Sequence, residues 1–257
     1  METPAPAFTD QTPFDLRCEW GAEGVAVLAP HADAVVIVDV LSFTTCVSVA
    51  TARGATVYSY RFRDDSAAAY AAKLNAELAA HRGSETPLQP FSLSPVSLAT
   101  VPPGTRLVLP SPNGSTLAFL AAAHGVPVFA GCLRNAAATA ALAATYGPRI
   151  ALIPAGERWG VSDGPLRPAV EDLIGAGAVL DALHALRPAV SLSPEAAVAV
   201  AAFRAVRDDL PAWLPRCASG RELAEGGYAG DVALAAALNA DDTAALLVGG
   251  AFVAQRG

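Results

Sequence analysis

Lysine is nearly absent from this 257-residue chain: Lys73 is the single lysine, and the arginines are scattered without forming a basic cluster. The net charge is −7 and the isoelectric point is near 5.0, so the chain lacks the basic patch typical of proteins that bind nucleic acid or anionic membranes. We therefore expect neither a nucleic-acid nor a membrane partner. A small anionic metabolite is compatible with the sequence if a local cation offsets the overall charge.

Cysteine is also scarce, and its spacing excludes two kinds of site. The four cysteines are Cys18, Cys46, Cys132 and Cys217, none of them in a C-x-x-C pair. This spacing argues against a zinc site and a disulfide framework, and it suits a reducing compartment. No uncharged apolar run reaches the roughly 18 residues that a membrane span needs. We predict a soluble, cytoplasmic protein.

What the chain does have is an apolar core sequence arranged as alternating strands and helices. Hydrophobic residues make up 53% of the chain, and the strand-like stretches are continuously apolar, as in parallel sheets covered on both faces. We predict an α/β fold, a three-layer α/β/α sandwich with a largely parallel central sheet. Residues 1–20 are expected to be an N-terminal extension and residues 21–257 a single domain, with two intertwined subdomains as the alternative. Low charge and high apolarity favour a homodimer.

Individual elements follow from local patterns. Strands are expected at 24–30, 34–40 and 55–60, and one last strand at 244–254. A helix is expected at 64–83, beginning at an Asp cap and ending at Gly. The Pro- and Ser-rich stretch 83–105 is too long for a simple turn, and such loops are usually functional or disordered.

The stretch "VVIVDVLSFTT" ends a buried strand on one carboxylate, Asp39. An N-cap and a reactive group are equally favoured by this position. A phosphatase of the haloacid dehalogenase type is excluded, because its second Asp would stand where this chain has Leu41.

Two strand-to-helix loops could bind an anion at helix amino ends. "SPNGST" offers Ser111, Asn113, Gly114 and Ser115, and "CLRN" repeats the geometry. An ordinary turn with a cap is the more common outcome for such loops taken singly.

Acidic residues recur where later strands end and helices begin. Glu157 emerges from the strand "RIALIPAG", and Glu171 and Asp172 fall in the first turns of a helix. If they meet Asp39 at the carboxyl edge of the sheet, they form an oxygen-rich site suited to Mg²⁺. Taken alone, Glu171 and Asp172 would simply complement the helix dipole. Asp231 is by default a helix cap.

Taken together and in order, six stretches resemble the 2-phosphosulfolactate phosphatase (ComB-like) family. They are "VVIVDVLSFTT", "SPNGST", "GCLRNAAATA", "IPAGE", "VEDLIGAGA" and "SGRELAEGG…GD", which span residues 35–231. The resemblance implies a Mg²⁺-dependent α/β enzyme that releases phosphate from 2-phospho-3-sulfolactate in coenzyme M biosynthesis. It differs at Ser42, where the family motif usually has Arg, and in "FSLSPVS", which keeps only Ser94 and Pro95 of a Gly-Asn-Ser-Pro stretch.

The resemblance and the residues together give the expected site. Catalytic residues are expected to be Asp39, Glu157 and Asp172. Metal ligands are expected to be Asp39, Glu157, Glu171, Asp172 and Asp231. Substrate-binding residues are expected to be Ser111, Asn113, Gly114, Ser115, Arg134, Asn135, Arg158, Ser219 and Arg221, with Arg134, Arg158 or Arg221 replacing the Arg missing at Ser42. Two alternatives stay open: a family member that binds a small anion without hydrolysing it, and a transferase acting on another phosphorylated metabolite.

Overall fold

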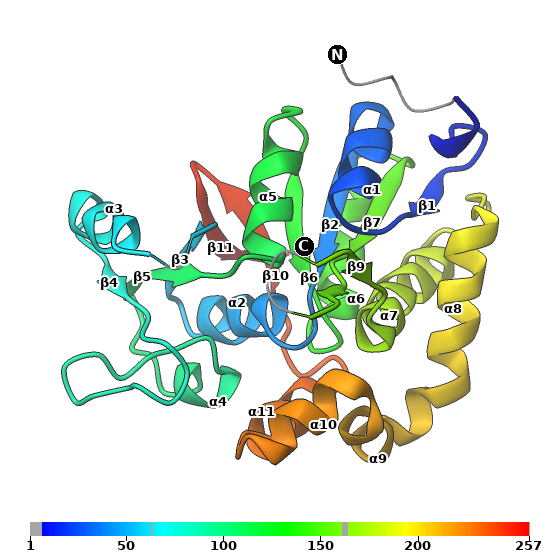
Figure 1. Cartoon of the computed structure of the whole chain (residues 1–257). Coiled ribbons are helices and arrows are strands. Elements are labelled where there is room, and N and C mark those ends of the chain that lie inside the picture. The colour runs from blue at the N-terminus through cyan, green and yellow to red at the C-terminus, as the bar shows by residue number, and fades with distance from the viewer. Residues whose placement is uncertain (1–6, 63, 161–163, 257) are drawn as a thin grey trace.

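The computed structural model describes residues 7–62, 64–160 and 164–256, which fold around one large sheet (Figure 1). The strands are β1 (Leu16–Cys18), β2 (Ala34–Val38), β3 (Thr56–Tyr60), β4 (Glu77–Leu78), β5 (Arg106–Pro110), β6 (Val128–Gly131), β7 (Ile150–Pro154), β8 (Glu157–Arg158), β9 (Leu166–Arg167), β10 (Ala244–Val248) and β11 (Ala251–Gln255). The helices are α1 (Gly21–Leu28), α2 (Phe43–Ala52), α3 (Ser66–Leu74), α4 (Pro95–Leu98), α5 (Gly114–Ala122), α6 (Ala136–Ala144), α7 (Val170–Leu186), α8 (Pro194–Val206), α9 (Leu210–Trp213), α10 (Ala218–Glu225) and α11 (Ala229–Ala235).

The sheet consists of two parallel blocks joined by a hairpin. Its strand order is β1-β7-β2-β6-β10-β11-β3-β5-β4. Strands β1, β7, β2 and β6 pair in parallel, as do β3, β5 and β4. Strands β10 and β11 lie between the blocks and pair antiparallel with each other and with both neighbours. The largely parallel sheet predicted from the sequence is confirmed.

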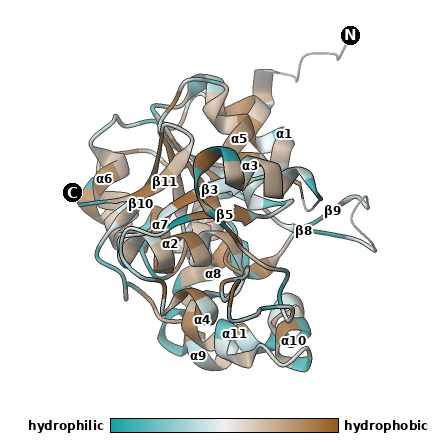
Figure 2. Cartoon of the chain, turned by 90° about the vertical axis from the view of Figure 1, so that its left-hand side faces the viewer, coloured by the Kyte–Doolittle hydropathy of each residue, from teal (hydrophilic) through white to brown (hydrophobic). Residues whose placement is uncertain are grey.

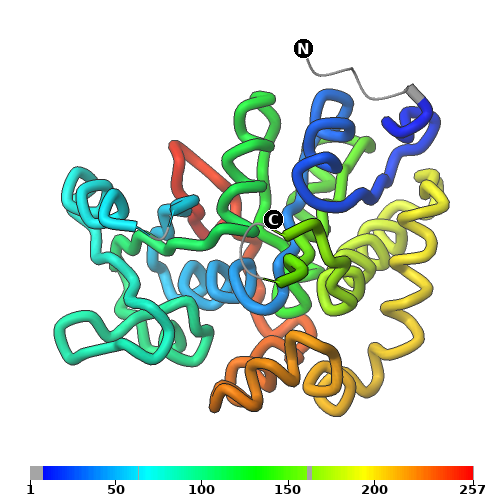
Figure 3. The backbone as a smooth tube through the Cα atoms, viewed as in Figure 1, coloured from blue at the N-terminus to red at the C-terminus, as the bar shows by residue number. Residues whose placement is uncertain are grey.

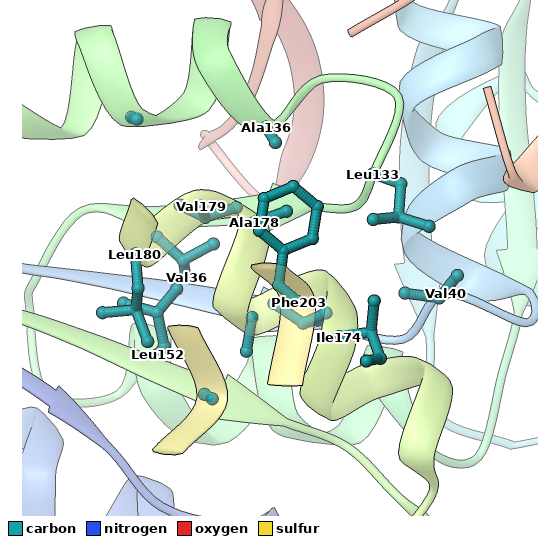
Figure 4. Close-up of a cluster of buried hydrophobic side chains, with 14 of the residues drawn as sticks. Val36, Val40, Leu133, Ala136, Leu152, Ile174, Ala178, Val179, Leu180 and Phe203 are labelled. Atoms are coloured by element: carbon teal, nitrogen blue, oxygen red, sulfur yellow. The ribbon is translucent and has the colours of Figure 1, made fainter. Parts of the chain in front are cut away.

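Helices cover both faces of this sheet, because its central strands bury side chains on both sides. On β2, Val36 and Val38 face one core with α6, α7 and α8, whereas Val35 and Ile37 face a second core with α1, α2 and α5. Figure 4 shows the first core, where Phe203 of α8 lies among side chains of α7 and the strands. This arrangement confirms the three-layer α/β/α sandwich.

The end of β5 lies near the end of β2 because the sheet twists, although the two strands do not run in the same direction. Three successive antiparallel pairings make β5 run opposite to β2 within the sheet. Neighbouring strands rotate by about 20–25°, and over the five steps from β2 to β5 this accumulates to roughly 100–125°. Figure 1 shows the result, with β5 lying across the view while β2 runs roughly vertically. The single carboxyl edge expected from the sequence therefore holds for β2 and β7, but not for β5.

Three local predictions differ from the structure. Residues 24–30, expected to be a strand, belong mostly to helix α1, whose buried positions Gly21, Gly24, Val25 and Leu28 are spaced as one helix face. The helix expected over 64–83 ends at Leu74, because Asn75 adopts a left-handed conformation with φ of 49°. The expected extension, residues 1–20, contains β1 and so contributes to the sheet, while its residues 1–6 lie outside the described residues. None of the helices in the described ranges combines the length and apolarity needed to cross a bilayer.

The last strand expected at 244–254 is in fact the hairpin β10–β11 in the middle of the sheet. Its turn is Gly249–Gly250, with φ values of 58° and 85°, a combination that suits a two-residue hairpin turn. An added Cβ at Gly249 would meet no heavy atom within 4 Å, so this position is constrained by conformation alone.

We expect Gly249→Ala to lower the free energy of unfolding by about 1–2 kcal/mol, the cost of left-handed backbone for a residue with a Cβ. Gly249→Asn is the matched control and should lose less, because Asn tolerates this region. Urea unfolding of both variants checks the expectation. Equal losses in the two would show that backbone conformation is not the cause.

Candidate functional site

Asp39 caps two helices at once. Its Oδ1 accepts a hydrogen bond from the Phe43 N–H at the start of α2, at 3.0 Å, and its Oδ2 accepts one from the Gly114 N–H at the start of α5, also at 3.0 Å. The carboxylate is 6% exposed and lies at two positive helix ends, which stabilise its charge. The N-cap residues themselves are Ser42 and Asn113, so Asp39 meets the dipoles of the two helices from outside the N-cap positions. The same contacts fix the carboxylate where the ends of β2 and β5 meet.

Gly114 makes this junction possible. A Cβ at this position would lie 2.3 Å from Phe43 Cδ1 and 2.8 Å from Asp39 Oδ2. Only glycine allows the α5 amide to approach the carboxylate this closely, so the "NG" of this loop is required by the site as well as by the turn.

Asp172 ties together the loops that follow β2 and β7. Its Oδ1 accepts from the Val40 N–H at 2.7 Å, and its Oδ2 accepts from the Gly156 N–H at 2.9 Å. Burial, then the charges of Asp39 and Glu171, raise the pKa of Asp172 well above its usual value. Because both oxygens already bond to backbone, this side chain serves to position the two loops.

Glu157 lies at the base of the β8–β9 ribbon, which projects from the body of the molecule (Figure 2). Its Oε2 accepts a hydrogen bond from Asn113 Nδ2 at 3.0 Å. Burial, reinforced by the negative charges of Asp39 and Glu171, raises the pKa of Glu157 to about 7. The loop after β5 thus contacts two acids, Asp39 through Gly114 and Glu157 through Asn113.

Asp39, Glu157, Glu171 and Asp172 form one electrostatically coupled group, which we call the acidic cluster. Glu171 is 2% exposed, and its Oε2 is buried without a hydrogen-bond partner among the described residues. Bringing several carboxylates together in a low-dielectric site is costly unless protons or a cation neutralise them. Without protons or a cation nearby, this cluster would therefore lower the stability of the fold.

A cavity of about 240 Å³ opens beside this cluster. It is lined by Asp39, Leu41, Ser42, Arg82, Leu93, Ser111, Pro112, Asn113, Glu157, Ser219, Glu222 and Leu223. Five predicted site residues thus share one cavity: Asp39, Ser111, Asn113, Glu157 and Ser219. They come from the ends of β2 and β5, from β8 and from α10, so distant parts of the chain meet here.

Two other predicted substrate-binding residues, Arg134 and Asn135, bond to other parts of the chain and do not line the cavity. The Arg134 guanidinium pairs with Asp241, at 2.8 and 3.0 Å, and also donates to the Leu234 carbonyl. Asn135 closes its own turn through the Cys132 N–H and the Ala130 carbonyl. The "CLRN" loop is therefore a structural turn, but Arg134 is partly buried rather than exposed, and the Asn135 side chain does not cap α6.

The remaining predicted residues lie at the margins of the site. Ser115 is fully buried, and its hydroxyl lacks a hydrogen-bond partner among the described residues. Arg158 is exposed and donates to the Gly164 carbonyl at 3.4 Å, while Arg221 pairs on the surface with Glu225 at 3.5 Å. Neither arginine reaches Ser42 in the structure, and neither lines the cavity.

Asp231 bonds to groups outside the acidic cluster. Its Oδ1 accepts from Ser94 Oγ at 2.6 Å and from the Val96 N–H at 3.1 Å, while its Oδ2 lies 3.5 Å from Arg82 Nε. Ser94 belongs to the "FSLSPVS" stretch, which is therefore part of the surroundings of this site.

Sequence reasoning missed Arg82 and Arg167. Arg82 lines the cavity and donates to Ser42 Oγ at 2.8 Å, and Arg167 donates to Ser219 Oγ at 3.3 Å. The one signal for Arg82 in the sequence was its place directly before the long stretch 83–105. In the backbone trace this stretch folds back toward α2 before it enters α4 (Figure 3). For Arg167, no local pattern marked the residue.

The oxygen donors present suit Mg²⁺ in the way this ion usually binds. Within the described residues, no three His, Cys, Asp or Glu side chains form a ready-made metal-binding group. Mg²⁺, however, commonly takes only one or two carboxylates and completes its shell with water and substrate phosphate. Asp39 and Glu157 at the cavity wall fit that mode, and the unpartnered oxygen of Glu171 adds negative charge behind them.

Comparison with known families agrees with the motifs. The family model described as 2-phosphosulpholactate phosphatase matches residues 26–250, which is well over half of the chain and includes every candidate site residue. The family predicted from the sequence is confirmed. A comparison with curated protein sequences gave no significant match.

The raised pKa of Glu157 predicts how stability depends on pH in the metal-free protein. The folded state holds this proton more tightly than the unfolded state, so the contribution of Glu157 to stability falls as pH rises from about 4.5 to about 7. We expect Glu157→Gln to raise the free energy of unfolding at pH 8 by roughly 1–3 kcal/mol and to have little effect at pH 4.

Chemical denaturation with EDTA present, at several pH values, measures this difference. Glu225→Gln, on the exposed surface of α10 and outside the cavity lining, is the matched control. A stabilisation by Glu157→Gln that is the same at pH 4 and pH 8 would contradict the electrostatic origin.

Proposed function

The chain belongs to the 2-phosphosulpholactate phosphatase family, and from that premise we propose that it hydrolyses the phosphate monoester of a small acid with Mg²⁺, 2-phosphosulfolactate being the substrate that the family name specifies. The observation that carries the proposal is the meeting of Asp39 and Glu157 in one cavity through the Asn113–Gly114 turn. Carboxylates and a loop at a helix amino end are the two components that metal-assisted phosphoryl transfer needs.

Asp39 and Glu157 would hold the ion. Two backbone N–H groups donate to the Asp39 carboxylate and hold it in place, and Glu157 is held near the same turn by Asn113. When bound, Mg²⁺ neutralises charge on the phosphoryl oxygens and orients the attacking water. Neutralisation is needed here, since an anionic substrate otherwise meets the acidic cluster.

Other residues orient the substrate and the loops. The Ser111 hydroxyl and the Asn113 amide line the cavity and can donate to phosphate oxygens. Asp172 holds the backbone after β2 against the backbone after β7, so Asp39 and Glu157 keep a fixed separation. Apolar walls such as the buried Leu41 and the half-buried Leu93 limit the water that reaches the phosphate.

We expect phosphate release from 2-phosphosulfolactate by the wild-type protein only when Mg²⁺ is present. Asp39→Asn should reduce kcat by at least about 100-fold, because it removes the charge that holds the ion. Asp33→Asn is the control, since Asp33 forms a peripheral ion pair with Arg149. Activity in EDTA equal to that in Mg²⁺ would remove the mechanism, and inactivity on every phosphorylated acid tried would remove the function.

Mg²⁺ binding should depend on pH, because the ion must displace the proton of Glu157. Below a pH of about 7 the apparent dissociation constant should rise by up to about tenfold per pH unit, and above it the affinity should level off. Calorimetric titration in two buffers of different ionisation enthalpy measures the proton released. Glu157→Gln should bind weakly without proton release, and an unchanged proton release in this variant would exclude Glu157 as a ligand.

A further inference from the structure

Arg82 is fixed against the cavity by contacts from four directions. Its Nη2 donates to Ser42 Oγ at 2.8 Å and also to the Leu93 carbonyl. Its guanidinium lies over the Tyr228 ring, 5.1 Å from the ring centroid, and Nε is 3.5 Å from Asp231 Oδ2. A long, flexible side chain is thus held in one orientation before any ligand arrives, which lowers the entropic cost of binding.

The charge of Arg82 is unusual for its place. Among the described residues that line the cavity, Arg82 is the single cationic side chain, whereas Asp39, Glu157 and Glu222 are acidic. Its Nη1 donates no hydrogen bond to the described residues, and the side chain is 22% exposed, so the fork retains donors for a ligand. A guanidinium with free donors is the preferred protein partner of phosphate and similar oxyanions.

The surroundings of Asp231 indicate a supporting role for this residue. Ser94 Oγ and the Val96 N–H occupy its Oδ1, and its Oδ2 faces Arg82 Nε in an ion pair that is longer than a hydrogen bond. Neither of these facing atoms has a hydrogen-bond partner among the described residues. The carboxylate therefore orients the guanidinium without satisfying it fully.

We propose that Arg82 binds a tetrahedral oxyanion of the substrate, and that Asp231 is a positioning residue for Arg82 rather than a metal ligand. The assignment rests on the proposed function only in taking this cavity as the substrate site. A phosphate and a sulfonate present the same three-oxygen face to a guanidinium, so either group of a small phosphorylated acid suits Arg82.

Calorimetric titration of the full-length, Mg²⁺-loaded protein tests Arg82 without turnover, with inorganic phosphate in one arm and methanesulfonate in the other. Arg82→Met should weaken binding of at least one probe by roughly tenfold or more, and Arg82→Lys should fall between this variant and the wild type. The more affected probe identifies the group that Arg82 holds. Circular dichroism shows whether each variant is folded.

Arg106→Met is the matched control. Arg106 also lies over a tyrosine ring, Tyr58, and also donates to a backbone carbonyl, that of Leu74, but it is remote from the cavity. It should leave both affinities unchanged. Affinities of Arg82→Met and Arg82→Lys equal to the wild type for both probes, or no binding of either probe by the wild type, would overturn the assignment.

Asp231→Asn separates the positioning role from a metal role. The Asn amide would present a donor to Arg82 Nε and turn the guanidinium away, so oxyanion affinity should fall by about threefold, with no further loss when Arg82→Met is already present. Mg²⁺ affinity, measured separately, should stay within about twofold of the wild type. A tenfold loss of Mg²⁺ affinity, or losses that add in the double variant, would overturn the role given to Asp231.

These measurements are independent of catalysis. Failure of the protein to hydrolyse any phosphorylated acid would remove the proposed function and leave the oxyanion and Mg²⁺ affinities to be judged separately. Normal hydrolysis with unaltered binding in the Arg82 variants would retain the proposed function and remove this inference.

Discussion

The double cap on Asp39 is the contact on which the rest of the site depends. One carboxylate satisfies the first amides of α2 and α5, and these helices follow strands from opposite parallel blocks of the sheet. Free amides at helix amino ends need acceptors, and here a single buried anion supplies two of them. The requirement draws the loops after β2 and β5 together, and with them Asn113 and, through Asn113, Glu157. The Asp39 carboxylate that holds the two helix ends is therefore also the candidate reactive group.

The site places more acidic side chains close together than a stable core favours. Glu171 and Asp172 are almost fully buried beside Asp39. The pKa values of Asp172 and Glu157 are raised first by the burial of these two carboxyl groups and then by the charges of Asp39 and Glu171. Such an arrangement lowers stability in the absence of a cation, and stability lost at a cluster of this kind is typical of binding and catalytic sites. Asp172 offsets part of the cost by bonding to two backbone amides.

Opposite charge reaches the cavity from a different part of the chain. Arg82 follows β4, and it meets Ser42 of the loop after β2 and Asp231 of α11. Among the described residues, the lining of the cavity thus combines three acidic side chains, one arginine, and several hydroxyl and amide groups. An ion and an oxyanion can lie next to each other in such a space, because each offsets the charge that the other would meet alone.

The sequence by itself determined the layers, most of the strands and the identity of the acids, because continuous apolar runs, caps and strand-end motifs are local signals. It also determined the family, since six motifs in order leave few alternatives. It misjudged residues 24–30 and 75–83, where a helical face and a left-handed Asn75 overrode the apparent pattern, and it joined β10 and β11 into one strand. Only the tertiary structure decided which arginine faces the cavity. Arg134, Arg158 and Arg221 stood inside or beside the motifs, yet their partners lie elsewhere, and Arg82 reaches Ser42 only because the chain after β4 folds back against α2. A long side chain is placed by contacts distant in sequence, and no local pattern records them.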